Sequence, residues 1–161
     1  MPTNEADLKH VADLIAQVEI AMLTTADENG ELRSRPMAVQ EAPFDGMLRF
    51  FTKDDSGKVD EIEREREVNV AVSCPEKGIF VSVTGSARLN RDRAKIDELW
   101  KDEYKVWFKD GKDDPHLAIL EVAADYVEYW DTPQDQPKRG YEAQEEAKQE
   151  SEYGKVEVGQ A

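Results

Sequence analysis

The feature that most constrains the fold is a series of short apolar segments separated by tight turns, with clear alternation of apolar and polar residues in 68–73 and one apolar face in 79–89. Alternation with a period of two is typical of strands that bury one face. The turn dipeptides Asn29-Gly30 and Asp45-Gly46 lie between such segments, and Asn-Gly in particular favours a tight hairpin. The segments predicted to be strands are 20–25, 32–41, 47–52, 68–73, 79–89, 117–122 and 126–130.

Helical periodicity is restricted to a few segments around these strands. Helices are predicted over 5–19, from Ser56 with Val59 and Ile62 on the buried side, and over 91–101 with Asn90 as its cap; a helical turn is predicted at 104–108. About six strands with hairpin links and a few peripheral helices favour an α+β barrel over a doubly wound parallel sheet.

The length of 161 residues favours one domain, which we place at 1–131. Residues 132–161 are rich in Gln, Glu and Lys without a clear period, and are predicted to be a flexible acidic tail. The net charge of −15 argues against binding to nucleic acid or to an anionic membrane. Since the N-terminus lacks a secretory pattern and no apolar run could span a bilayer, we expect a cytoplasmic protein.

The residues often found in metal or nucleophile sites are sparse. Cys74 is the only cysteine, so neither an internal disulfide nor a multi-cysteine metal site can form. We interpret the segment 113–116, Asp-Asp-Pro-His, as a turn and predict no metal site. No nucleophile elbow or Walker loop is present, and no catalytic residue is predicted.

A phosphate site is indicated where the third strand runs into the short helix. Thr52 ends the strand, Ser56 stands at the helix N-cap position, and Lys58 falls in the first helical turn. A helix N-terminus offers free N–H groups and partial positive charge, to which these side chains add donors. A lysine there opposes the helix dipole, and a bound phosphate would compensate it.

Arginines on the preceding strand point to the same place. Arg33 and Arg35 are two residues apart and so share a face of their strand. We expect the strand 47–52 to be its hairpin partner, which would bring Arg35 to the phosphate for bidentate contact. Pro36, which lacks an N–H, could lie against a flat ring. The residues alone therefore predict a phosphate-containing ligand.

The order of these motifs resembles the pyridoxamine-phosphate-oxidase-like flavoproteins, and their general-stress-protein branch more closely. The resemblance covers about residues 5–131. It is carried by Arg35, the Phe51-Thr52 pair, Ser56-Gly57-Lys58, the strands 80–85 and 127–130, and Trp107-Phe108 followed by Gly111 and 113–115.

The resemblance implies a six-stranded, mostly antiparallel split β-barrel that binds FMN, and a homodimer with two FMN sites at its interface. Arg35, Thr52, Ser56 and Lys58 would hold the phosphate, with Gly57 among them. The ring or ribityl chain would be lined by Pro36, Met37, Ala38 and Phe51. Trp107 and Trp130 would flank the ring or reach it from the partner.

Departures from the family pattern bear on the substrate. Gly57 replaces a second phosphate-side arginine, Gln40 replaces a lysine, and Phe80 replaces a glutamine. The Arg-x-His pair that follows the tryptophan in the oxidases is absent after Trp130. Oxidation of pyridoxamine phosphate is therefore not expected. The open alternatives are a flavin-dependent oxidoreductase using NAD(P)H or another electron donor, a non-catalytic flavin carrier or sensor, and a binder of another phosphate-bearing cofactor such as a deazaflavin.

Overall fold

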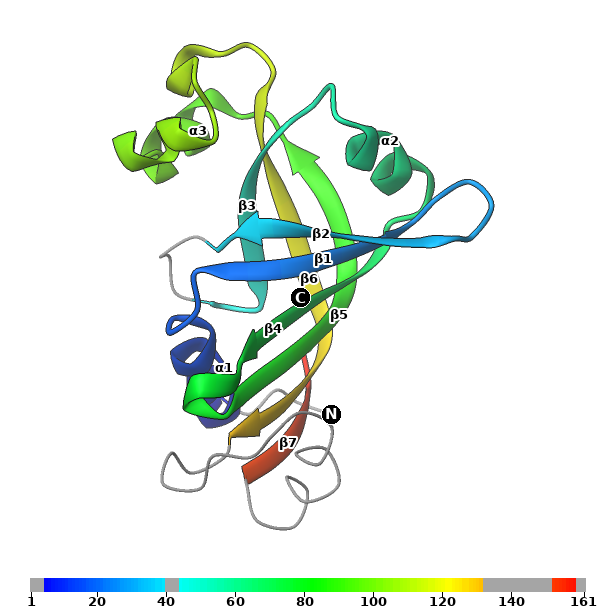
Figure 1. The fold of residues 1–161 in the computed structure, drawn as a ribbon, viewed down its shortest axis with the longest axis vertical. Helices are drawn as coiled ribbons and strands as arrows, with labels where there is room; N and C mark the ends of the chain where they lie inside the picture. The colour runs from blue at the N-terminus through cyan, green and yellow to red at the C-terminus, as the bar shows by residue number, and fades with distance from the viewer. Residues whose placement is uncertain (1–4, 40–43, 132–151, 159–161) are drawn as a thin grey trace.

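One curled antiparallel sheet organises the computed structural model, which describes residues 5–39, 44–131 and 152–158 (Figure 1). Its strands run in the order β2-β1-β4-β5-β6-β3, and β7 also pairs with β6. The strands are β1 Ile20–Ala26, β2 Leu32–Ala38, β3 Met47–Lys53, β4 Glu67–Cys74, β5 Ile79–Asn90, β6 Leu117–Asp131 and β7 Glu152–Glu157. The predicted α+β class and antiparallel barrel are confirmed, with a seventh strand added.

In the described part of the chain, three α-helices and three 3₁₀ turns lie around this sheet (Figure 1). They are α1 Glu5–Ile15, α2 Gly57–Arg64, α3 Arg93–Leu99, η1 Pro75–Lys77, η2 Asp102–Val106 and η3 Gly111–Asp113. Both α1 and α3 are shorter than predicted. The cap of α3 is Asp92, whose side chain accepts a hydrogen bond from Ala94 N, so the prediction of Asn90 as cap was wrong. Within the described ranges, no helix is long and apolar enough to cross a membrane.

The core formed by the described residues divides into two apolar clusters. The larger lies inside the curled sheet and under α1, and includes the fully buried Leu23, Val83 and Phe50. The smaller joins Phe51 on β3 to Ile96 on α3 and to the helical turn after it. Burying each large side chain contributes about 1.5–3 kcal/mol, so the second cluster holds α3 and η2 against the end of the barrel.

The pairing of β2 differs from the prediction. It forms a hairpin with β1, in register from Ile20↔Ala38 to Ala26↔Leu32, and not with β3. The tight turn closed by Gly30 N donating to Asp27 O, with Gly30 at φ 78°, joins β2 to the strand before it. Because β3 pairs with β6, β2 and β3 are the two end strands of the sheet order and face each other across the split of the barrel (Figure 1).

β6 is one strand where two were predicted. In its pairing with β5, Tyr126 lies opposite Thr84 and Ala124 lies opposite Gly85. Asp125 is therefore left as an extra residue of β6 in a bulge. A Cβ on Gly85 would collide with Ala123 O, so the bulge requires glycine there. The extra residue shifts the phase of alternation, which is why the apolar pattern breaks in two along the sequence.

The C-terminal segment contributes β7, so the prediction of a flexible tail was wrong for residues 152–157. β7 pairs antiparallel with the second half of β6, and Val156 is buried. Gly154 lies directly against the Tyr129 ring, where a side chain would not fit. Residues 132–151 lie outside the described part of the chain, and the domain boundary at 131 stays a prediction.

Candidate functional site

A cavity of about 440 Å³ opens in the split between β2 and β3. This volume is within the range of small-molecule sites. Its walls come from β2, β3, the start of α2 and the η2 region. The lining residues are Ile20, Pro36, Met37, Ala38, Phe51, Thr52, Lys53, Asp55, Ser56, Lys58, Tyr104, Trp107 and Phe108. Most of the residues predicted to bind a cofactor are therefore brought together in one place.

Two buried hydroxyl groups mark one end of the cavity. Thr52 is 1% exposed, and neither its Oγ1 nor Ser56 Oγ has a hydrogen-bond partner within the described chain. Ser56 is the N-cap residue of α2, as predicted, but its side chain makes no capping bond. A buried hydroxyl without a partner costs about 1–3 kcal/mol, so this pair indicates a site for a polar ligand.

Lys58 supplies charge at the same end. Its side chain is half-buried in the first turn of α2. Burial lowers the pKa of Lys58, and the nearby positive charge of Arg35 lowers it further. No ion pair within the described residues includes Lys58. A partly desolvated ammonium group beside free hydroxyls and a helix N-terminus is suited to an anion such as a phosphate.

Arg35 occupies a different place from the one predicted. Its Nη1 donates to Thr25 Oγ1 at 2.6 Å and its Nη2 to Glu61 Oε2 at 3.1 Å, while Thr25 donates to the same Glu61 oxygen at 2.5 Å. Arg35 is thus held by β1 and α2, close to Lys58 but outside the lining of the cavity. Thr25 and Glu61 were missed because they meet Arg35 only through the β1–β2 pairing and the packing of α2.

Aromatic side chains form another part of the lining. The Phe51 ring lies 5.6 Å from that of Tyr104 and 6.3 Å from that of Phe108, centroid to centroid. Trp107 lines the same cavity and remains 57% exposed, which is unusual for a tryptophan. Tyr104 and Phe108 were not predicted as site residues, although their spacing of four within a helical turn places them on one side.

Besides Arg35, two predicted residues do not line the cavity. Gly57 begins α2, and a Cβ there would meet no atom within 4 Å. Trp130 pairs with Phe80 near the other end of β6. Its side chain shares the outer face of the sheet with Met22, since Met22↔Ala71↔Ser82↔Glu128 form one row and alternate residues share a face.

A charged cluster ties the end of β3 to the start of β6 behind the site. Asp54 Oδ1 lies 2.9 Å from His116 Nδ1, and Arg91 Nε lies 3.3 Å from Asp54 Oδ2. The Asp54 contact raises the pKa of His116 and lowers that of Asp54. Asp114 accepts from His116 N, as expected for a turn residue, and pairs with Lys53 at 3.1 Å.

Comparison with known proteins shows which family this chain is similar to. Residues 6–154 match the family described as pyridoxamine 5'-phosphate oxidase like. General stress protein 26 of Bacillus subtilis is 32% identical over 124 residues, which is 74% of this chain and 85% of that protein.

Solved structures agree. The general stress FMN/FAD binding protein of Xanthomonas citri superposes with a TM-score of 0.65 at 29% identity, over 84% of this chain and 92% of that one. General stress protein 26 of Bacillus anthracis gives a TM-score of 0.66 at 24% identity, over 76% and 92%.

The chain therefore belongs to the pyridoxamine 5'-phosphate oxidase-like family and has its split-barrel fold. Within that family it falls in the general stress protein 26 branch.

Proposed function

We propose that this protein binds FMN, with the phosphate held at the β3–α2 junction and the ring system lying along β2. The observation that carries the proposal is the pair of unpartnered hydroxyls of Thr52 and Ser56 beside the desolvated Lys58. It is supported by the Xanthomonas citri relative, which is described as an FMN/FAD binding protein.

The preference for FMN follows from the shape of the polar end. Thr52, Ser56 and Lys58 line the cavity together with Lys53 and Asp55, while the rest of its lining is apolar or aromatic, which suits a ligand with a single terminal phosphate. Pro36, Met37, Ala38 and Phe51 line the remainder, where a flat ring and its ribityl chain would lie.

The test is a titration of flavin-free protein with FMN, FAD and riboflavin, followed by the quenching of flavin fluorescence. We expect FMN to bind most tightly and riboflavin to lose at least about tenfold in affinity, the value of one charge-assisted contact. Equal affinity for FMN and riboflavin would show that these donors do not hold a phosphate. A protein that takes up a deazaflavin and none of the three flavins would favour that cofactor instead.

We further propose a homodimer in which the outer face of the sheet carries the interface. On β1, Ile20 is 42% exposed and Met22 41% exposed, and Trp130 lies on the same face. Since Ile20, Pro36 and Ala38 border the cavity from this face, a second copy could complete the site with its own Trp130.

Sedimentation velocity tests the dimer directly. The variant Met22→Glu should sediment as a monomer and bind FMN more weakly, because a buried carboxylate is costly at an interface. The control Val106→Glu changes another exposed apolar side chain, on η2, and should remain dimeric. A wild-type monomer with full FMN affinity would refute the shared site.

For the chemistry, we propose a flavin-dependent oxidoreductase that accepts electrons from NAD(P)H or another donor. The flavin would supply the redox chemistry, and the chain would bind and orient it. Anaerobic mixing of the FMN-loaded protein with NADH or NADPH tests this by bleaching of the flavin absorbance. Failure of both donors would favour the second candidate, a flavin carrier or sensor. Pyridoxamine phosphate should not be oxidised.

A further inference from the structure

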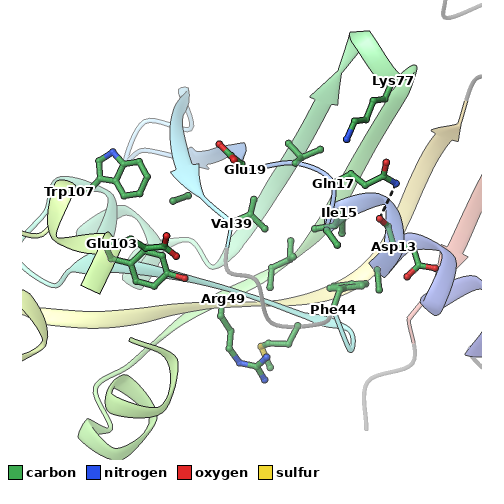
Figure 2. A pocket seen from close by; sticks show the side chains of 17 residues that line it. Asp13, Ile15, Gln17, Glu19, Val39, Phe44, Arg49, Lys77, Glu103 and Trp107 are labelled. Carbon is green, nitrogen blue, oxygen red and sulfur yellow. Dashed lines mark hydrogen bonds between the residues drawn. The ribbon is translucent and has the colours of Figure 1, made fainter. Parts of the chain in front are cut away.

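A second cavity, of about 800 Å³, adjoins the first (Figure 2). The two share Ala38, Tyr104 and Trp107 in their walls. The additional walls come from the end of α1 and the segment after it, from the first half of β3, and from η1 and η2. The shared residues make the second cavity a compartment beside the proposed cofactor site, accessible to a separate small molecule.

The charges that face this compartment do not cancel. Asp13, Glu19 and Glu103 line it, and within the described residues none of these three carboxylates has a hydrogen bond or an ion pair. Arg49 also lines it, but Glu121 at 3.5 Å and Asp45 at 3.7 Å neutralise its guanidinium group. Lys77 is the remaining cationic residue of the lining.

The charged groups are distributed along the compartment. Figure 2 shows Glu103 beside Trp107 at one end, Glu19 above the middle, and Lys77 with Gln17 and Asp13 toward the other end. The end nearest the cofactor cavity therefore combines the carboxylate of Glu103 with the Trp107 indole, which is 57% exposed, and the carboxylate of Glu19 lies toward the middle. An aromatic face together with carboxylates is the combination that recognises organic cations.

We propose that this end of the compartment binds an organic cation with an apolar body, held by Trp107 and by the carboxylates of Glu19 and Glu103. The net charge of −15 would favour the encounter of such a ligand with the protein. If the protein binds a flavin as proposed above, this cation would be the molecule that is presented to the flavin. The cation site itself does not depend on flavin binding.

The test uses benzyltrimethylammonium as the probe, with benzyl alcohol and benzoate as neutral and anionic comparators, in calorimetric titrations of the full chain. We expect the cation to bind at least about tenfold more tightly than either comparator. The double variant Glu19→Gln/Glu103→Gln should lose about tenfold or more in affinity, and Trp107→Leu about 2- to 30-fold.

A double variant Glu31→Gln/Glu98→Gln serves as the matched control, because it removes the same charge from exposed positions outside the compartment. It should bind the cation as the wild type does. Equal affinity for all three probes, or equal losses in the two double variants, would overturn the proposal.

The proposed function is scored separately by flavin absorbance. In FMN-loaded protein, the cation should shift the flavin spectrum, because the two cavities share a wall. Cation binding to a chain that takes up no flavin would refute the proposed function and leave the cation site standing. Flavin uptake without selective cation binding would refute the cation site alone.

Discussion

Replacing Lys58 by methionine tests the proposed phosphate site most directly, because it should move ligand affinity and stability in opposite directions. The substitution keeps most of the apolar stem and removes the ammonium group. A charge-assisted contact to phosphate contributes about 1.5–3 kcal/mol, so the Kd for FMN should rise about 10- to 150-fold. The Kd for riboflavin, which has no phosphate, should stay within about twofold.

The flavin-free protein should become more stable. The pKa of Lys58 is lowered by burial and by Arg35, so its charged form is less favourable in the folded than in the unfolded chain. A lysine with a depressed pKa costs stability at neutral pH, and that cost disappears only as the pH rises past the folded-state pKa toward the unfolded one. Methionine carries no such cost, so the unfolding midpoint should rise.

The measurements are fluorescence titrations with FMN and riboflavin, and thermal unfolding of flavin-free protein at pH 7. The control for the change in net charge is Lys9→Met, at an exposed lysine on α1. It should leave the affinity for FMN and for riboflavin unchanged. The assignment of Lys58 is wrong if FMN affinity is unchanged, or if riboflavin affinity falls as much as FMN affinity does.

Other substitutions have equally definite outcomes. Thr52→Val should weaken FMN about tenfold and leave flavin-free stability unchanged or raised by about 1 kcal/mol, since the buried hydroxyl has no partner; a loss of stability would mean that it has one. His116→Asn tests the contact with Asp54: the raised pKa of His116 contributes stability below its unfolded value of 6.5, and this is lost as the pH rises through the folded pKa. The unfolding midpoints of wild type and variant should therefore differ at about pH 5.5 and converge at about pH 8.5; a constant difference contradicts the pairing. Gly154→Ala should release β7 from Tyr129, seen as faster amide exchange over 152–157 with little change elsewhere.

The part of the site that could be predicted is the part that is contiguous in sequence. Thr52, Ser56 and Lys58 lie within seven residues, and a strand end followed by a helix start fixes their relative positions without long-range information. The residues that lie near them in space but far away in sequence could not be predicted in this way. The place of Arg35 depends on which strand β2 pairs with and on how α2 packs against β1.

The errors in the fold also have local physical causes. The alternation in β6 changes phase at the bulge at Asp125, so a period-two pattern yields two strands from one. In β7, Gly154 has no side chain and Val156 is the one buried apolar residue among those whose burial is described, which leaves almost no periodic signal. Asp92 and Asn90 are both good caps by residue type, and the choice between them depends on the Asn90 side chain accepting from Asp92 N.

The split between β2 and β3 affects the tendency of the ligand-free protein to aggregate in the cell. Among the residues that the structure describes, each of these strands has one partner in the sheet order, so each presents unpaired backbone groups along its other side. Such edges can recruit strands from other molecules, and Pro36 removes one donor from β2. A ligand bound between β2 and β3 would contact both strands and cover these edges. Cells starved of riboflavin should therefore yield more aggregated protein, and supplementing the growth medium should recover it.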